Sequence, residues 1–142
     1  MVAIAVTAAN VAAGSGAVIR DVTAGATITA GEVVYSDSTD SNEYKLADAN
    51  VAAVTADAVG IALNNADDGQ PLRIQTGGNI NPGGTVVVGE VYMVSTTAGE
   101  ILDITSLAPG DYPTILGVGT TATNLKLSIN AAGVVAAAGV FY

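Results

Sequence analysis

The chain has 142 residues and a formal net charge of −9, with 50% hydrophobic, 12% charged and 4% aromatic residues and no His, Cys or Trp. The absence of His and Cys excludes Ser-His-Asp and Cys-His catalysis, disulfides, and zinc sites built from these ligands. Four cations against 13 acidic residues also argue against nucleic acid as a partner, because a phosphate backbone needs clustered Lys and Arg.

The residue types along the chain favour short β-strands. Val, Ile and Thr are abundant, and Gly, Asn, Asp and Pro interrupt them at short intervals. In chain order, strands are predicted at 17–22, 32–36, 43–46, 58–63, 71–76, 90–95, 114–119 and 125–129. Turn chemistry is concentrated at 37–42, 64–70, 77–84, 97–99 and 108–111. This regular alternation predicts an all-β fold, a short-strand β-barrel or sandwich.

Two short segments are candidates for helix. Residues 48–57 are rich in Ala, and Asp48 is a suitable N-cap. Residues 103–107 precede Pro109 and are long enough for a single turn. Neither segment is long enough to be stable without tertiary packing.

An internal echo links residues 28–78 with residues 86–132. Each copy has a Gly-Glu-Val opening, a Gly inside an apolar run, and a closing strand in which a cation lies between two apolar residues. The matched pieces are Gly31-Glu32-Val33 with Gly89-Glu90-Val91, Gly60 with Gly117, and Leu72-Arg73-Ile74 with Leu125-Lys126-Leu127. Because the three pieces recur in the same order, we predict a duplicated β unit that forms one barrel or two lobes.

Apolar segments without charge flank the β-rich region. We predict an extended N-terminal arm at 1–16, a β-rich domain at 17–132 and an apolar tail at 133–142. The arm lacks the basic start of a signal peptide, and the tail is shorter than the about 20 residues that cross a bilayer, so neither predicts membrane targeting. Extended ends of this kind can add a strand to a neighbouring subunit. The predicted contact residues of the two ends are Val2, Ile4, Val6, Val11, Val140, Phe141 and Tyr142.

Two acidic clusters are candidates for metal binding. The loop at 37–43 offers several oxygen ligands for Ca²⁺, but it lacks the ligand spacing of an EF-hand, so a solvated hairpin tip is favoured. Asp67-Asp68-Gly69 has the carboxylates for a metal or for hydrolysis, but Asp-Gly between strands is typical of a turn. No cofactor is predicted.

The cations are so few that each is a candidate anchor. They are Arg20, Lys45, Arg73 and Lys126. One interpretation pairs each with a nearby acid, at no more than about 1 kcal/mol. The other makes Arg73 and Lys126 contacts to a partner, because their matched places in the echo predict that they share one face.

The motifs of the echo resemble those of small β-rich decoration proteins, also called cement or head-stabilising proteins, of tailed bacteriophages. The resemblance covers roughly residues 17–132. It is carried by 29–35 (Thr-Ala-Gly-Glu-Val-Val-Tyr), Lys45-Leu46-Ala47, Val59-Gly60-Ile61-Ala62, Asp68-Gly69, Leu72-Arg73-Ile74 and Gly89-Glu90-Val91-Tyr92.

This resemblance implies a non-enzymatic virion protein on the outer capsid surface. Such proteins bind the major capsid protein, often as homotrimers, and bridge neighbouring subunits. Composition agrees with an interface role, because a chain that is half hydrophobic has few polar side chains to cover its surface. Two other classes stay open: a tail-fibre or surface-adhesion domain that recognises a host glycan or protein, and a carboxylate-dependent hydrolase.

Overall fold

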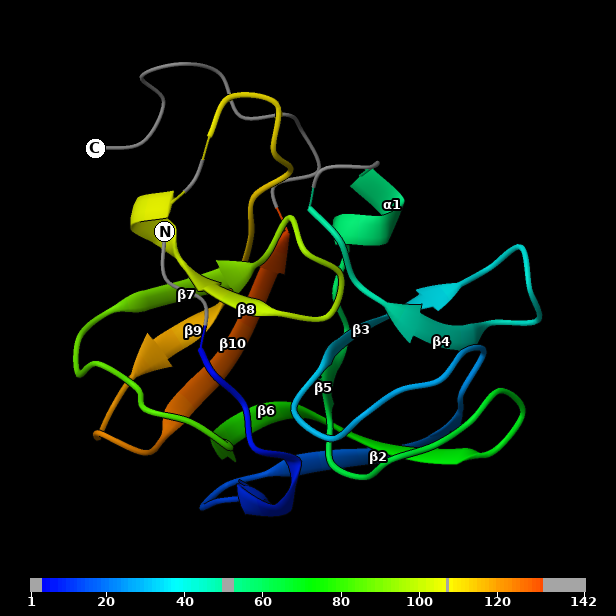
Figure 1. Cartoon of the computed structure of the whole chain (residues 1–142), viewed down its shortest axis with the longest axis horizontal. Helices are drawn as coiled ribbons and strands as arrows, with labels where there is room; N and C mark the ends of the chain where they lie inside the picture. Colours follow the sequence, from blue (N-terminus) through cyan, green and yellow to red (C-terminus); the bar gives the residue numbers. More distant parts are fainter. Residues whose placement is uncertain (1–3, 50–52, 107, 132–142) are drawn as a thin grey trace.

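The protein is an all-β protein of ten antiparallel strands in one sheet that curls into a half-barrel (Figure 1). The computed structural model describes residues 4–49, 53–106 and 108–131. Besides strands, this part contains one α-helical turn and two 3-10 turns. The strands are β1 (Val11–Ala13), β2 (Val18–Thr23), β3 (Val33–Asp37), β4 (Glu43–Leu46), β5 (Gly60–Ala62), β6 (Pro71–Pro82), β7 (Val91–Val94), β8 (Ile101–Asp103), β9 (Thr114–Gly119) and β10 (Leu125–Ala131). The helical turns are Ala8–Asn10, α1 (Ala53–Ala56) and Ile104–Ser106.

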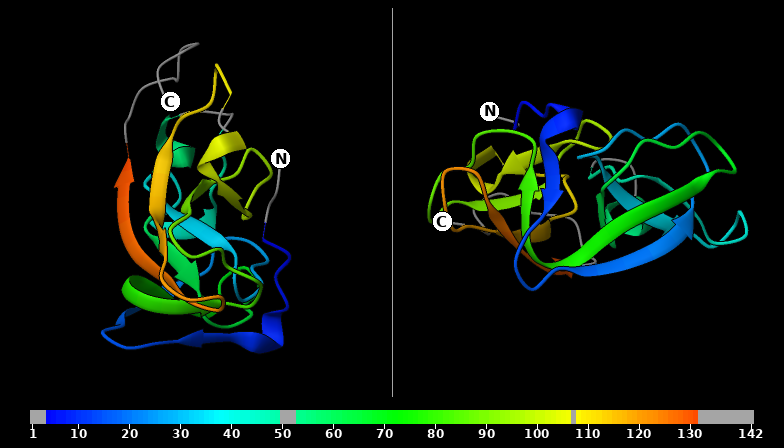
Figure 2. Two further views of the ribbon diagram at one scale, coloured as in Figure 1. Left: turned by 90° about the vertical axis from the view of Figure 1, so that its left-hand side faces the viewer. Right: turned by 90° about the horizontal axis from the view of Figure 1, so that it is seen from below.

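Strand β6 is the seam of the sheet. The strand order is β4-β3-β5-β6-β10-β9-β7-β8, and both β1 and β2 also pair with β6. The first half of β6 pairs with β2 and β5, and its second half pairs with β1 and β10. Figure 2 shows β6 and the β1–β2 segment running together along one side of the molecule. Strand β6 therefore joins β1, β2 and β5, which precede it in the chain, to β10, which follows it.

Two hydrophobic cores lie on opposite faces of β3 and β5. Val33, Tyr35 and Ile61 belong to the larger core, which also holds the inward residues of β7, β9 and β10. Val34 and Ala62 belong to the smaller core, which is shared with β6. Because side chains alternate along a strand, a strand that is buried on both faces reads as a continuous apolar run. This explains the fully buried Val33–Tyr35 and Gly60–Ala62 segments.

Eight of the ten strands form two four-stranded units with the same internal order, and β1 and β2 add to β6. In the first unit β3 pairs with β4 and β5, and β5 pairs with β6; in the second unit β7 pairs with β8 and β9, and β9 pairs with β10. The register is also the same, because Val34 lies opposite Gly60 and Tyr92 lies opposite Gly117. The units meet where β6 pairs with β10.

The turn before each first strand is built by the same three backbone hydrogen bonds. In the first unit, Glu32 N donates to Thr29 O (3.1 Å), Gly31 N to Ala62 O (2.8 Å) and Ala62 N to Glu32 O (2.9 Å). In the second unit, Glu90 N donates to Val87 O (3.1 Å), Gly89 N to Gly119 O (2.8 Å) and Gly119 N to Glu90 O (2.9 Å). Gly31 and Gly89 both adopt positive φ, at 93° and 81°, where only Gly is unstrained.

The closing strands correspond in a different register from the one predicted. Ile74 lies opposite Ala62 in the first unit, and Leu125 lies opposite Gly119 in the second. Ile74 is therefore the counterpart of Leu125, and the predicted match of Leu72-Arg73-Ile74 with Leu125-Lys126-Leu127 is wrong by two residues. Alternation explains the error, because a shift of two residues leaves each side chain on the same face of its strand.

The predicted strands are confirmed in position, and 43–46 and 114–119 agree to the residue. Three predictions are corrected. The three-residue strands β1 and β8 were not expected, and β6 continues through 77–82, where Gly and Pro favoured a turn. In the described residues of the candidate helix 48–57 there is one α-helical turn, Ala53–Ala56, and the single turn predicted at 103–107 is found as a 3-10 turn at Ile104–Ser106. No helix in the described part of the chain is long and apolar enough to cross a membrane.

Gly60 and Gly117 give a direct test of the close backbone approach at equivalent places. A Cβ at Gly60 would collide with the carbonyl oxygen of Gln75, and one at Gly117 with that of Lys126. We expect Gly117→Ala and Gly60→Ala each to lower the free energy of unfolding by about 2–3 kcal/mol, because the strands must separate. Urea denaturation measures this change.

Gly77→Ala is the matched control. Its Cβ would meet only Val18 Cγ2, at 3.6 Å, which is ordinary contact. This variant should be neutral within about 0.5 kcal/mol, or slightly stabilised by a stiffer unfolded chain. Equal losses in all three variants would contradict the packing described for β5 and β9.

Candidate interaction surface

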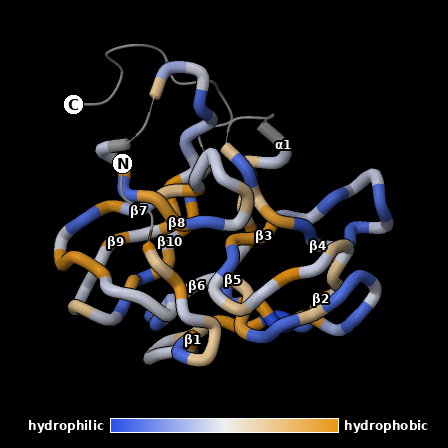
Figure 3. Tube along the Cα trace, viewed as in Figure 1, coloured by the Kyte–Doolittle hydropathy of each residue, from blue (hydrophilic) through white to orange (hydrophobic). Residues whose placement is uncertain are grey.

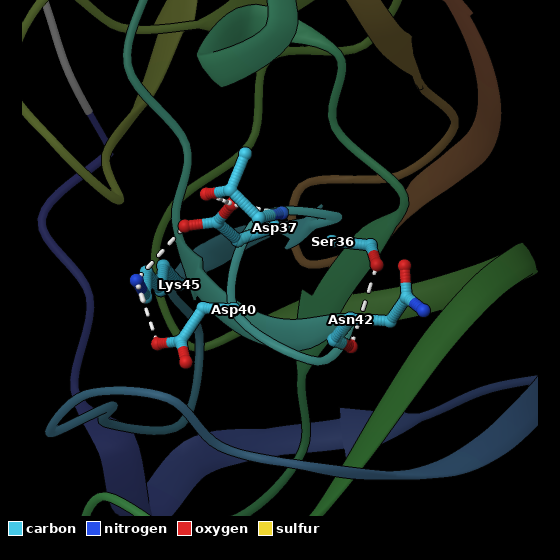
Figure 4. Close-up of polar contacts among 6 residues, drawn as sticks. Ser36, Asp37, Asp40, Asn42 and Lys45 are labelled. Carbon is cyan, nitrogen blue, oxygen red and sulfur yellow. Dashed lines mark hydrogen bonds and ion pairs between the residues drawn. The ribbon is translucent and has the colours of Figure 1, made fainter.

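The acidic loop at 37–43 is a charged hairpin tip between β3 and β4 (Figure 4). Lys45 Nζ lies 2.8 Å from Asp37 Oδ2 and 3.0 Å from Asp40 Oδ2, so one cation forms ion pairs with two carboxylates of the loop. Ser41 and Asn42 both have positive φ, as in a tight hairpin turn. The structure thus brings together a local ion-pair network, and the described residues contain no group of three or more acidic side chains arranged to hold a metal ion.

Hydrogen bonding sets the ionisation of this tip. Lys45 and Thr39 both donate to the Asp37 carboxylate, and these bonds lower the pKa of Asp37 from 3.8 to about 2. The carboxylates of Asp37 and Asp40 raise the pKa of Lys45 above its usual value by accepting hydrogen bonds from its ammonium group. The charges of Asp37 and Lys45 therefore persist at neutral pH.

The other acidic candidate, Asp67-Asp68-Gly69, is a turn before β6. Gln70 N donates to Asp67 O (2.9 Å), Asp67 N donates to Gln70 Oε1 (2.9 Å), and Gly69 has a φ of 84°. Asp67 and Asp68 are both exposed. These bonds account for the residue types in this segment without a bound metal.

Arg73 and Lys126 lie on different faces of the sheet, contrary to the predicted shared face. The neighbours of Arg73, Leu72 and Ile74, point into the smaller core, whereas the neighbours of Lys126, Leu125 and Leu127, point into the larger core. Arg73 Nε lies 3.0 Å from Asp21 Oδ1, and both side chains are exposed. The two cations therefore do not form one anchor.

The described part of the N-terminal segment is folded onto the chain's own body. Ile4 N donates to Ile101 O (2.9 Å), and the Ile4 side chain is 8% exposed, so Ile4, one of the predicted contact residues, packs in the larger core of its own chain. Val6 is 36% exposed, and Val11 pairs with Pro82 through β1. The other predicted contacts, Val2, Val140, Phe141 and Tyr142, lie outside the described residues.

Apart from Val6, the exposed large apolar side chains in the described part of the chain lie at two places. Val18 and Ile19 lie on β2, whose only partner strand in the described part is β6. Val87, Val88 and Val118 lie at the end of the second unit and are 58%, 64% and 40% exposed. We call these three side chains the valine end. Figure 3 shows the turn before β7 as a hydrophobic stretch at the left edge of the molecule.

A groove of about 720 Å³ runs beside the valine end. Residues 4–7 form one wall, and the turn at 83–90 with the ends of β7 and β8 forms the other. The groove is lined by two carboxylates, Glu90 and Asp103, and by no cation. A smaller groove of about 380 Å³ lies on the opposite side of the N-terminal segment, against the turn at 29–32.

Comparison with known proteins identifies no relative: no family model, no curated protein and no solved structure matches the chain.

The sequence patterns did not predict that Val87, Val88 and Val118 would be exposed. Val87 and Val88 lie in a strongly apolar run, which reads as a buried strand, and their exposure depends on which turn the N-terminal segment covers. One signal was present. The matching positions in the first copy are Thr29 and Ala30, so the second copy is more apolar at the same turn.

The hairpin tip makes a pH-dependent prediction. A lowered pKa means that Asp37 stabilises the fold when ionised, so its contribution is present above about pH 4 and is lost as the pH falls towards 2. In Lys45→Met we expect the pKa of Asp37 to rise from about 2 towards 3.8, as followed by carboxyl ¹³C shifts in an NMR titration.

Arg73→Met serves as the control, because it removes an exposed ion pair on another strand. It should leave the titration of Asp37 unchanged. A pKa of Asp37 that stayed near 2 in Lys45→Met would show that Lys45 does not set it.

Proposed function

We propose that this chain is a structural protein that coats the outer surface of a bacteriophage head, binds the major capsid protein and braces neighbouring subunits, as a homotrimer. The observation that carries the proposal is the exposed apolar surface on a rigid β body: the valine end on one side and Val18 with Ile19 on another. A body with apolar contacts at separate places is suited to bridging two neighbours.

Two further features support a mechanical role. Among the motifs that carry the likeness to phage decoration proteins are the Gly-Glu-Val turn and the Gly of β5, and both features recur in the second unit at the same register. We also infer that the two units arose by duplication, because they share strand order, register and turn hydrogen bonds. Within the described residues, the carboxylates at 37–43 and 67–68 are engaged in turns or stand in solvent, which favours structure over hydrolysis.

In this role, stabilisation comes from area buried across a subunit junction. Each half-exposed Val that becomes covered contributes about 1 kcal/mol at the usual value for apolar surface. Many copies on one shell then add up to a large resistance to separation of the subunits. The trimeric state follows from the family likeness alone.

The test is a copy-number measurement on particles purified from the source of the gene. Quantitative mass spectrometry should find this chain at a fixed, high ratio to the major capsid protein, and antibodies should reach it on intact heads. Its absence from particles would refute the proposal. A few copies confined to the tail would support a host-recognition domain instead.

A double variant tests the role of the valine end. Val87→Ser with Val88→Ser removes exposed apolar surface and should leave the melting temperature nearly unchanged. Rebinding to heads stripped of the protein should weaken about 30-fold, for a loss of about 2 kcal/mol. The matched control, Ala12→Ser with Ala13→Ser, changes exposed residues of β1 and should bind like the wild type. Equal affinity of both variants would exclude the valine end from the interface.

A further inference from the structure

We propose that the groove between residues 4–7 and the turn at 83–90 binds an extended segment of a partner protein, with small apolar side chains and one Lys or Arg. The inference starts from a difference between the two units. Their first turns have the same backbone hydrogen bonds, but among the described residues the N-terminal segment packs on Gly31 of the first turn and does not reach Gly89 of the second.

In the first unit, the N-terminal segment packs on the turn. A Cβ at Gly31 would collide with Val6 Cγ1 and would lie 3.1 Å from Val11 Cγ2, so these two side chains sit directly on the turn. Ala30 is 5% exposed as a result. The occupant of this turn is therefore an uncharged segment of small residues, in which Val6 and Val11 flank the 3-10 turn at Ala8–Asn10.

In the second unit, the same turn is bare. A Cβ at Gly89 would meet nothing within 4 Å, and Val88, the counterpart of Ala30, is 64% exposed. The bare turn is also the more apolar one, since Val87 and Val88 replace Thr29 and Ala30. A turn that has lost its cover but gained apolar surface fits a segment supplied by another molecule.

The charged side chains of the groove indicate which charge the bound segment should carry. Glu32 Oε1 accepts a hydrogen bond from Thr29 N at 2.6 Å, so in the first unit the carboxylate serves its own turn. The Glu90 carboxylate, its counterpart, has no hydrogen bond or ion pair among the described residues, and it lines the groove. Asp103 stands in the same lining, where it accepts from Thr105 Oγ1. Two carboxylates without a cation in the groove favour a basic side chain on the segment.

The dimensions agree with one strand of peptide. The groove holds about 720 Å³, and Gly83 and Gly84 fix residues 4–7 as its wall, because a Cβ at either position would collide with Thr7 O or Ala5 O. Ile4, Ala5 and Val87 provide the apolar contacts, and the Tyr92 hydroxyl, which accepts from Val87 N at 2.9 Å, fixes the position of Val87. Main-chain and apolar contacts of this kind give affinity, and the carboxylates give selection for charge.

The experiment selects peptides from a random decapeptide library displayed on a carrier, with the whole protein immobilised as bait. The expected result is enrichment of sequences in which one Lys or Arg lies among Val, Ile, Thr and Ala. In ¹⁵N NMR titrations the best synthetic peptide should shift the amides of 4–7, 83–90 and 103–105. Replacing its basic residue by Gln should weaken binding about tenfold or more.

Protein variants decide whether the groove is responsible. Glu90→Gln should weaken binding of the basic peptide about tenfold and leave that of its Gln counterpart unchanged. Asp68→Asn removes one exposed negative charge from a distant turn and should have no effect. The proposal is overturned if no peptide is enriched, if shifts fall elsewhere, or if Glu90→Gln and Asp68→Asn behave alike. The outcome does not depend on the chain's being a capsid protein, because no particle enters the measurement.

Discussion

The fold depends on a wall of two strands, β3 and β5, that is buried on both faces. Val33 and Ile61 face the larger core, while Val34 and Ala62 face the smaller one, so neither core can form without this wall. Gly60 makes the wall possible, because its missing side chain lets β5 approach β6 closely. Truncation of a fully buried side chain such as Ile61 would cost about 2–5 kcal/mol and would disturb the larger core across the whole molecule.

The second constraint is that two equivalent units share one N-terminal segment. Residues 4–11 cover the turn of the first unit and contact Ile101 of the second, so they stabilise the body while leaving one turn exposed. A protein built from two like halves thus has an asymmetric surface. The exposed Val87 and Val88, and the Glu90 carboxylate, which has no polar partner among the described residues, lie at the second-unit turn, whose Gly89 the segment does not reach.

Sequence patterns predicted the parts of the fold that depend on local chemistry. β4 and β9 were predicted to the residue because turn residues bound them on both sides, and the Gly-Glu-Val repeat identified corresponding turns. The second half of β6 was missed because Gly77 and Gly78 usually break strands, whereas here they allow a bend at the seam. The faces of Arg73 and Lys126 and the exposure of Val88 depend on tertiary packing, which a single sequence does not encode in any local pattern.

A brace transmits force only if its contact surfaces are joined by a rigid body. Val18 and Ile19 on β2 and the valine end are connected through β6 and the wall, so the proposed role requires both units to unfold together. Native-state hydrogen exchange tests this most directly. The slowest amides of β3 and β5 and those of β7 and β9 should exchange with the same free energy, equal to that of global unfolding. Exchange of the second unit at a free energy several kcal/mol lower would show two independent halves and would contradict the central role of the wall.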